Sequence, residues 1–225
     1  MKVLVFSDVH GNLESLKAIL NIIDNNNYDK VIFLGDLVDF GPNPNECIDL
    51  LKKHKDIIYL YGNHELYLSG NIKMDKIKEC FVKWTKDRLS KENLNFVLNN
   101  NKLYYSIKHN GKVLMFKHYF TKRNYKNYPF KNIHDNYEPV KDCDYLFLGH
   151  DHDNKEFKIN NTNVYIIGSV GTKKDIYYYT IDLNDDINIE KHILKYNYDD
   201  FYNKLKNVDY IEKKHIFKHI YDIEI

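Results

Sequence analysis

The chain has 225 residues, of which 43% are hydrophobic and 29% charged, a globular composition with enough length to bury a sizeable core. The formal net charge of +1 gives no overall field that favours nucleic acid or an anionic membrane. Three cysteines without a C-x-x-C pair argue against a disulfide framework or a zinc ribbon. No run approaches the ~20 apolar residues of a membrane helix, and residues 1–6 are too short for a signal peptide, so we expect a cytoplasmic protein.

The first part of the chain alternates between strand and helix patterns. Short apolar runs predict buried strands at 2–6, 31–34 and 57–61. Apolar residues at helical spacing predict helices over 13–24 and from 44 to about 54. This strand–helix order implies parallel strands with helices on the faces of the sheet.

The remainder of the chain mixes helix, hairpin and strand patterns. Residues 74–98 predict an amphipathic helix, and 102–118 predict a β-hairpin because Asn110-Gly111 matches the twist of paired strands. A polar and aromatic loop is expected at 119–140. Further strands are predicted at 145–149, 164–168, 176–182 and 187–194, with one or two short helices at the C-terminal end.

The chain shows no internal repeat and no clear linker. We therefore interpret residues 1–225 as one domain. Its motif core spans 1–182, and a C-terminal strand and helices follow at 187–225.

Polar side chains of metal-ligand type directly follow five predicted strands. They are Asp8, His10, Asp36, Asp39, Asn63, His64, His118, His150 and His152. In open α/β sheets, ligands bind just beyond the carboxyl ends of the strands. Each motif alone is weak evidence, because a lone histidine after a strand is more often capped or solvated. Ligand-type residues at five separate strand ends are hard to explain by the stability of the fold alone, because buried unpaired polar groups are unfavourable.

The types of ligand indicate the kind of metal. Carboxylate, amide and imidazole groups without thiolate suit Mn²⁺, iron, Co²⁺, Ni²⁺ or Zn²⁺. About seven donors are too many for one tetrahedral ion. Two ions that share a bridging carboxylate fit, and such sites stabilise the attacking and leaving oxygens of a phosphoryl displacement. We expect two divalent ions, with manganese favoured.

The order of motifs is D-x-H, G-D-x-x-D, G-N-H-E, a later lone histidine and G-H-x-H, over residues 8–152. It resembles the calcineurin-like metallophosphoesterase superfamily. The stretches "DVHGN", "GDLVDFGPNPNE" and "GSVG" are similar to its small bacterial and archaeal phosphodiesterase branch, which includes diadenosine-tetraphosphatase-like proteins. The resemblance implies a four-layer α/β/β/α sandwich of two mixed sheets flanked by helices. It also implies a metal-dependent phosphoesterase for a small phosphodiester or nucleotide-type substrate.

The resemblance further implies a role for each residue. The implied metal ligands are Asp8, His10 and His152 for one ion, Asn63, His118 and His150 for the second, and Asp36 as the bridge. A metal-bridging water or hydroxide would be the nucleophile. His64 would face the leaving-group oxygen as a proton donor or charge stabiliser. Asp39 would keep His64 cationic, because a nearby carboxylate raises the pKa of an imidazole.

Three other features carry predictions. Arg123, in the basic and aromatic stretch 118–128, is a candidate substrate-binding residue that would fork onto a phosphate, with ordinary loop packing as the alternative. Glu65 stands where the family more often has aspartate, and we expect it to brace the loop. The segment 211–221 is more typical of docking or oligomer contact than of chemistry, with one helical face made by Ile211, His215, Ile216 and His219.

Two alternative functions remain open at this point. One is a non-catalytic protein-binding scaffold of the same fold, although such members tend to lose ligands or the histidine of G-N-H. The other is a protein phosphatase or nuclease of the same superfamily. A net charge near zero and the lack of appended domains weakly disfavour this second alternative.

Overall fold

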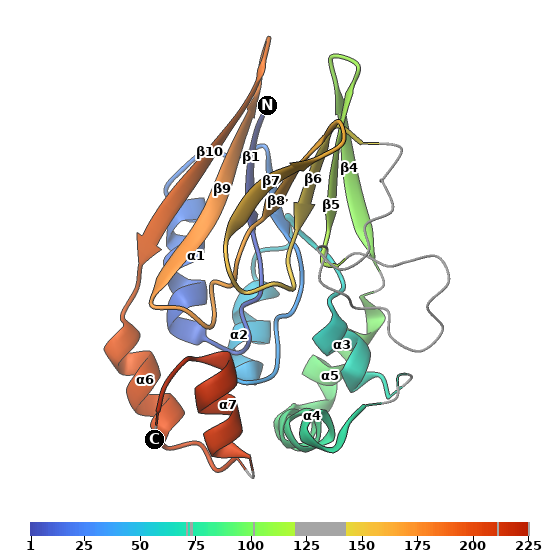
Figure 1. Cartoon of the computed structure of the whole chain (residues 1–225). Coiled ribbons are helices and arrows are strands. Elements are labelled where there is room, and N and C mark those ends of the chain that lie inside the picture. The colour runs from blue at the N-terminus through green and yellow to red at the C-terminus, as the bar shows by residue number, and fades with distance from the viewer. Residues whose placement is uncertain (71, 73, 101, 120–142, 211, 225) are drawn as a thin grey trace.

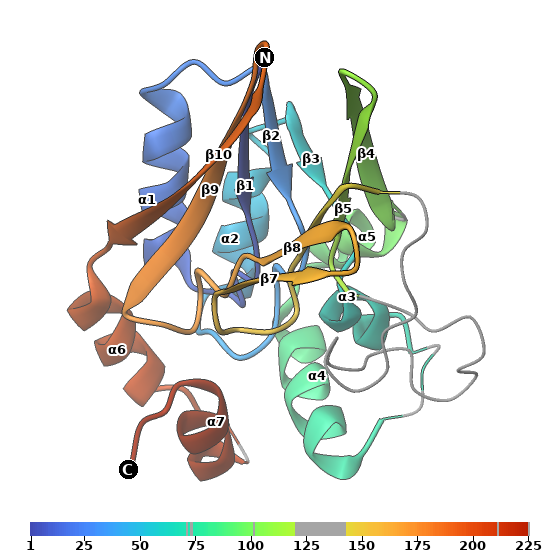
Figure 2. The ribbon, with the colours of Figure 1, turned by 45° about the horizontal axis from the view of Figure 1, so that its top comes forward.

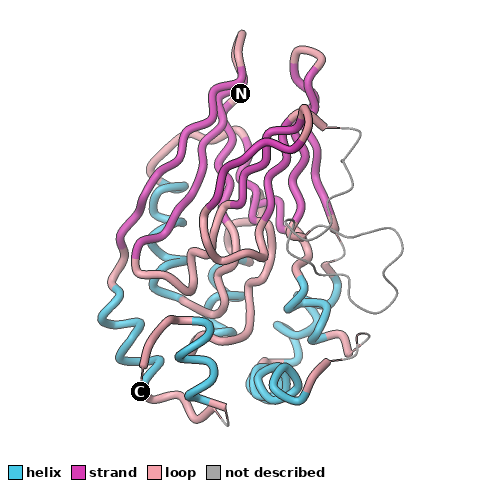
Figure 3. Tube along the Cα trace, in the orientation of Figure 1, coloured by secondary structure: helices cyan, strands magenta, loops and turns pink. Residues whose placement is uncertain are grey.

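The structure, a computed structural model, describes residues 1–70, 72, 74–100, 102–119, 143–210 and 212–224. Two five-stranded sheets lie face to face, with helices beside them and beneath one end (Figure 1). Figure 3 shows the same division, with the strands in the upper part of the molecule and most helices below. The predicted α/β fold of two mixed sheets flanked by helices is confirmed.

The first sheet has the strand order β10-β9-β1-β2-β3. Its parallel strands are β1 (Lys2–Phe6), β2 (Lys30–Phe33) and β3 (Ile57–Tyr59), as the alternating strand and helix patterns predict. Its antiparallel strands are β9 (Asp175–Leu183) and β10 (Ile187–Lys195). Because β9 pairs with β1, strands from the two ends of the chain complete one sheet.

The second sheet has the strand order β4-β5-β6-β8-β7. The strands are β4 (Tyr104–His109), β5 (Lys112–Lys117), β6 (Tyr145–Leu148), β7 (Lys155–Ile159) and β8 (Thr162–Ile166). The predicted hairpin turn is confirmed, with positive φ angles of 46° at Asn110 and 75° at Gly111. The sequence analysis missed β7, an edge strand whose charged and apolar residues alternate.

The helices are α1 (Leu13–Asp24), α2 (Pro44–Leu51), α3 (Asn63–Leu68), α4 (Lys76–Arg88), α5 (Lys91–Asn99), α6 (Tyr198–Lys206) and α7 (Lys213–Ile220). The segment 74–98 is helical as predicted, but it forms two helices, α4 and α5, and not one. Leu89 has an extended conformation, and the Ser90 hydroxyl accepts a hydrogen bond from the backbone N–H of Asn93, which caps a new helix. The helix α3 was also not expected.

Strand β1 contributes to two apolar layers. Val3 and Val5 pack between the two sheets, in a cluster that includes Phe116 and Phe147 of the second sheet. Leu4 and Phe6 point the opposite way, into the cluster formed with the helices. Side chains alternate between the faces of a strand, so a strand buried on both faces is apolar throughout. Within the described residues, no helix is long and apolar enough to cross a membrane.

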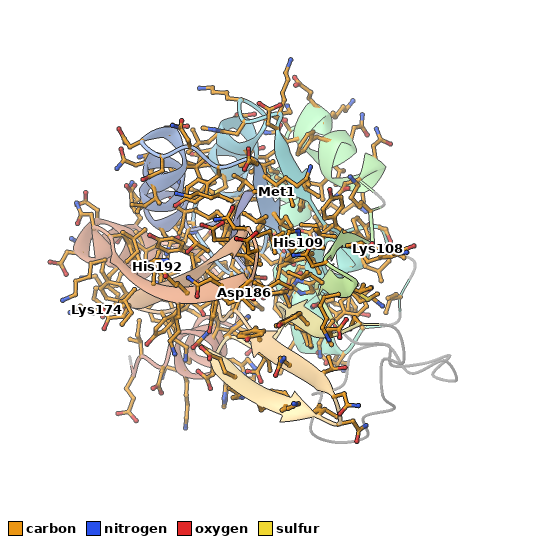
Figure 4. The ribbon with its side chains drawn as sticks, turned by 90° about the horizontal axis from the view of Figure 1, so that it is seen from above. Met1, Lys108, His109, Lys174, Asp186 and His192 are labelled. Atoms are coloured by element: carbon orange, nitrogen blue, oxygen red, sulfur yellow. The ribbon has the colours of Figure 1, made fainter. Side chains whose placement is uncertain are left out.

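The turns at one end of the two sheets contact each other. The Asn110 side chain donates a hydrogen bond of 2.9 Å to the carbonyl of Asp185, so the β4–β5 turn meets the β9–β10 turn. Figure 4 shows this end from above, with His109 and Asp186 labelled. The carboxyl ends of the parallel strands, with the loops that carry most of the motif residues, lie at the opposite end (Figure 2).

Candidate metal centre

The loops that follow β1 and β2 are joined by backbone hydrogen bonds. The N–H of Asp8 donates to the carbonyl of Gly35, and the N–H of His10 donates to the carbonyl of Asp36, both at 3.0 Å. Asp8, His10, Asp36 and Asp39 all have positive φ angles, between 48° and 69°. Each such non-glycine residue costs of order 1–3 kcal/mol, and strained residues of this kind cluster at functional sites.

Three of the predicted ligands form a first cluster. The Asp8 Oδ1 atom lies 3.7 Å from His10 Nε2 and 3.7 Å from His152 Nε2, and the two nitrogens are 3.0 Å apart. Asp8 Oδ1 is buried and has no hydrogen-bond partner. A buried carboxylate oxygen without a donor is unfavourable, and a cation held by these three groups would satisfy it. The residues present therefore fit a metal ion.

Four further predicted ligands form a second cluster. His118 Nε2 lies 3.0 Å from Asp36 Oδ2 and 3.0 Å from Asn63 Oδ1, and His150 Nδ1 lies 2.7 Å from the same amide oxygen. Asp36 Oδ2 is also 3.8 Å from His10 Nε2. Asp36 therefore lies between the two clusters, and Asp36, His118 and His150 are close enough to one another to hold a metal ion.

Backbone carbonyls orient two of the imidazoles. His10 Nδ1 lies 3.1 Å from the carbonyl of Val38, and His118 Nδ1 lies 3.1 Å from the carbonyl of Leu34. A carbonyl only accepts hydrogen bonds, so Nδ1 is the protonated nitrogen in both rings. When each ring is neutral, its Nε2 atom points a lone pair into the site, an arrangement that is common for histidines that ligate metals.

The electrostatics of the clusters favour the metal-binding forms of His150, His152 and Asp36. At His118, burial acts to lower the pKa, but Asp36 and Asp8 outweigh it and raise the pKa to about 9, so this ring would release a proton on binding a metal. Burial, with the neighbouring His10, lowers the pKa of His152 to about 3. Burial and His118 lower the pKa of His150 to about 4, so both imidazoles are neutral at pH 7. Burial acts to raise the pKa of Asp36, but the nearby histidines, His118 first, hold it well below its usual value. Neutral imidazoles and ionised carboxylates are the forms that bind cations.

Glu65 ties the loop after β2 to the start of α3. Its carboxylate is fully buried and accepts three backbone hydrogen bonds, from Asp36 at 3.0 Å, Leu37 at 2.7 Å and Gly62 at 2.8 Å. Gly62 leaves room for the Asp36 carboxylate beside this loop, because a Cβ atom at residue 62 would lie 2.2 Å from Asp36 Oδ1. These contacts are the bracing expected of Glu65, and they fix Asp36 relative to Asn63.

Two carboxylates and two phenylalanine rings surround the His64 side chain. Its Nδ1 atom lies 2.7 Å from Asp39 Oδ2, and its Nε2 atom lies 3.9 Å from Asp36 Oδ2. The ring centroids of Phe40 and Phe81 lie 4.7 and 5.7 Å from that of His64. Burial acts to lower the pKa of His64, but Asp36 and Asp39 outweigh it and raise the pKa above its usual value. By distance alone, His10, Asp36 and His64 also form a group that can hold a metal ion.

A groove of about 410 Å³ opens above both clusters. The clusters contribute Asp36, Asn63, His150 and His152 to its lining, and His64 lies among them. The groove residues on two helices were not predicted to lie at the site, namely Ile77, Lys78 and Phe81 of α4 and His215 and Ile220 of α7. No local signal identifies them, because they do not follow strands and their helices meet the site only through the tertiary fold.

The structure also bears on two other predicted features. Ile216 is 1% exposed and packs in the core, so it is not part of an exposed docking face on the segment 211–221. Ile211 and the candidate substrate residue Arg123, with most of the predicted loop at 119–140, lie outside the described residues.

The chain belongs to the calcineurin-like phosphoesterase family, whose profile matches residues 1–154. An uncharacterized protein of Methanocaldococcus jannaschii is 35% identical over 152 residues, which cover 66% of this chain and 61% of that protein. A symmetrical bis(5'-nucleosyl)-tetraphosphatase of Coxiella burnetii is 37% identical over 65 residues, or 28% of this chain and 22% of that enzyme. The matched region thus spans less than two thirds of these relatives.

A solved structure shows the same fold over nearly the whole chain. A metallophosphoesterase from Sphaerobacter thermophilus superimposes with a TM-score of 0.68 at 21% identity, and the match covers 94% of this chain and 95% of that one. A hypothetical protein from Pyrococcus horikoshii OT3 gives a TM-score of 0.74 at 14% identity, covering 100% and 99% of the two chains. These likenesses include the C-terminal strands and helices beyond residue 154.

Proposed function

We propose that this chain hydrolyses small phosphoesters, of the phosphodiester or nucleotide type, with two divalent metal ions. The observation that carries the proposal is the position of Asp36 between two clusters of buried ligand-type side chains. Paired metal sites that share a carboxylate suit the displacement of one phosphate oxygen by another. Membership of the calcineurin-like phosphoesterase family supports this chemistry.

The proposed ligand sets follow the two clusters. Asp8, His10 and His152 would hold one ion, Asn63, His118 and His150 the other, and Asp36 would contact both. The unpartnered Oδ1 atom of Asp8 and the Nε2 atoms of His10 and His118 support this division. Oxygen and imidazole donors without thiolate suit an intermediate divalent ion, and within that group we propose manganese as the favoured metal.

The bound ions would supply Lewis-acid charge to the phosphate and lower the pKa of a water molecule. His64 would then donate a proton from Nε2 to the leaving-group oxygen. Asp39 accepts the Nδ1 hydrogen bond, which fixes the orientation of the ring and favours its cationic form. We propose this role for His64 in preference to a third ligand beside His10 and Asp36, because the two clusters already supply ligands for both ions without it.

The named relatives support a nucleotide-type substrate. The Coxiella burnetii match is named as a symmetrical bis(5'-nucleosyl)-tetraphosphatase. A second match, from Oceanobacillus iheyensis, is named as an asymmetrical bis(5'-nucleosyl)-tetraphosphatase and is 35% identical over 92 residues. The matches cover only 22% and 37% of those enzymes, so the substrate class of this chain is part of the proposal.

The proposal is tested by the hydrolysis of bis(p-nitrophenyl) phosphate after chelation and re-addition of Mn²⁺. We expect no turnover without metal and restored turnover with it. A panel of mononucleotides, cyclic nucleotides and dinucleoside polyphosphates then ranks the natural substrate classes. No turnover of any substrate with several divalent metals would contradict the proposal and favour a binding scaffold of the same fold.

A further inference from the structure

The groove above the clusters has two facing walls that come from distant parts of the chain. One wall is α4, through Ile77, Lys78 and Phe81, and the other is α7, through His215 and Ile220. Figures 1 and 2 show both helices beneath the strand ends that lead into the site. The helix α7 starts at residue 213, beyond the residues 1–154 that match the family profile.

Buried contacts and hydrogen bonds hold the two walls in place. Ile216 and Phe217, 1% and 0% exposed, anchor α7 in the core. Asp209, just before α7, accepts hydrogen bonds of 2.7 and 2.8 Å from Arg88 and one of 2.9 Å from the Trp84 indole. These hydrogen bonds link the residues before α7 to α4, and they fix the positions of the two groove walls relative to each other.

The chemistry of the walls favours a flat, uncharged group. Ile77 and Phe81 line the groove from α4, and Ile220 lines it from α7. Lys78 forms an ion pair with Asp75, which also lines the groove, so this pair leaves no unbalanced charge on the α4 wall. Apolar side chains on both walls can bury the faces of a planar ring, and burial of an aromatic ring removes a large apolar area from water.

Resting on the proposed phosphoesterase function, we propose that the slot between α4 and α7 binds the leaving group, and that this group carries a planar, uncharged aromatic ring. The Phe81 ring lies 5.7 Å from that of His64 at an interplanar angle of 29°, so the slot begins beside the proposed proton donor. His215 is then a specificity-determining residue, whose imidazole lines the slot and offers a polar edge to a ring substituent or ring nitrogen.

The inference is tested by binding rather than turnover. In an alkylphosphonate a C–P bond stands in place of the scissile P–O bond, so binding is measured without hydrolysis. The probes are benzylphosphonate, methylphosphonate and 2-carboxyethylphosphonate, titrated into the Mn²⁺-loaded protein by isothermal calorimetry. We expect benzylphosphonate to bind about 10-fold more tightly than methylphosphonate, because its ring is buried. The charged carboxyethyl probe should bind no more tightly than the methyl probe.

Variants on each wall identify the slot. Ile77→Ala, Ile220→Ala and His215→Ala should each weaken benzylphosphonate binding about 3–10-fold and leave methylphosphonate binding unchanged. Lys218→Ala is the matched control, because Lys218 is exposed on α7 and does not line the groove. Circular dichroism melts check that each variant folds.

The outcomes separate the two proposals. If wild type shows no preference for the benzyl probe, or all variants keep it, the slot is wrong while the phosphoesterase proposal stands. If none of the three phosphonates binds the metal-loaded protein and bis(p-nitrophenyl) phosphate is not hydrolysed, both proposals are wrong. Tighter binding of the carboxyethyl probe than of the benzyl probe would contradict a slot that selects an uncharged aromatic ring.

Discussion

His64 Nδ1 lies 2.7 Å from Asp39 Oδ2, and both side chains are buried at the edge of the metal-ligand clusters. Asp39 belongs to the loop after β2 and His64 to the start of α3. The pair therefore couples two separate strand ends. This geometry suits an imidazole that is held in one orientation and kept cationic, with its Nε2 atom 3.9 Å from Asp36 Oδ2.

Replacement of His64 should separate catalysis from metal binding. We expect His64→Ala to lower kcat for bis(p-nitrophenyl) phosphate by about 10²–10⁴-fold, the usual effect of losing a positioned acid. Bound metal, measured by elemental analysis, should be unchanged. Loss of one ion together with activity would show instead that His64 is a ligand with His10 and Asp36.

The pH dependence of kcat should report on the His64–Asp39 pair. The nearby carboxylates raise the pKa of His64, and a proton donor is active only while protonated. Activity should therefore fall as pH rises through that raised pKa. Asp39→Asn removes one of the raising charges, so the alkaline fall in kcat should move to lower pH. Asp87→Asn, a change at an exposed side chain of α4, is the control. If kcat of Asp39→Asn and of wild type fell over the same alkaline pH range, the result would argue against the proposed role of the pair.

Glu65 should stabilise the fold through the three backbone N–H groups that donate to its carboxylate. Glu65→Gln replaces one accepting oxygen with an N–H donor that faces backbone N–H groups. We expect the free energy of unfolding to fall by about 1–3 kcal/mol, as for an unsatisfied buried donor. Urea unfolding measures this change. The control Glu92→Gln, at an 84% exposed side chain paired with Lys52, should change stability by less than about 1 kcal/mol.

Gly62 should be required for the position of Asp36. In Gly62→Ala the new Cβ would collide with the Asp36 carboxylate and its backbone nitrogen. We expect affinity for Mn²⁺ to fall about 10–100-fold, as for other disturbances around metal ligands. Gly70→Ala is the matched control, because it lies in open space at a positive φ of 74°. It should lose about 1 kcal/mol of stability and keep its metal affinity.

Local patterns in the sequence predicted much of this arrangement, because apolar runs mark the strands and polar residues directly after them must share one sheet edge. Asp8, Asp36, Asn63, His118 and His150 were found in this way, and the structure brings them together. The pattern could not show α3, because its six residues begin with Asn63, His64 and Glu65 of the G-N-H-E motif and show no helical period of their own.

A local helix cap, a weak strand signal and long-range packing account for the parts that sequence patterns did not predict. The break at Ser90 depends on one cap, and β7 is a short edge strand with little apolar signal. The groove wall on α7 is defined by burial of Ile216 and Phe217, which turns His215 toward the site. An amphipathic helix alone does not reveal which other helix lies across from it.

The most direct test of a two-metal phosphoesterase is the number of Mn²⁺ ions bound per chain, titrated by calorimetry while phosphodiester turnover is followed on the same samples. The account predicts two ions in wild type, turnover that depends on both, and loss of metal affinity and turnover together in Asp36→Asn, because Asp36 contacts both clusters. Full turnover with one ion or none, or two tightly bound ions in Asp36→Asn with wild-type turnover, would contradict it.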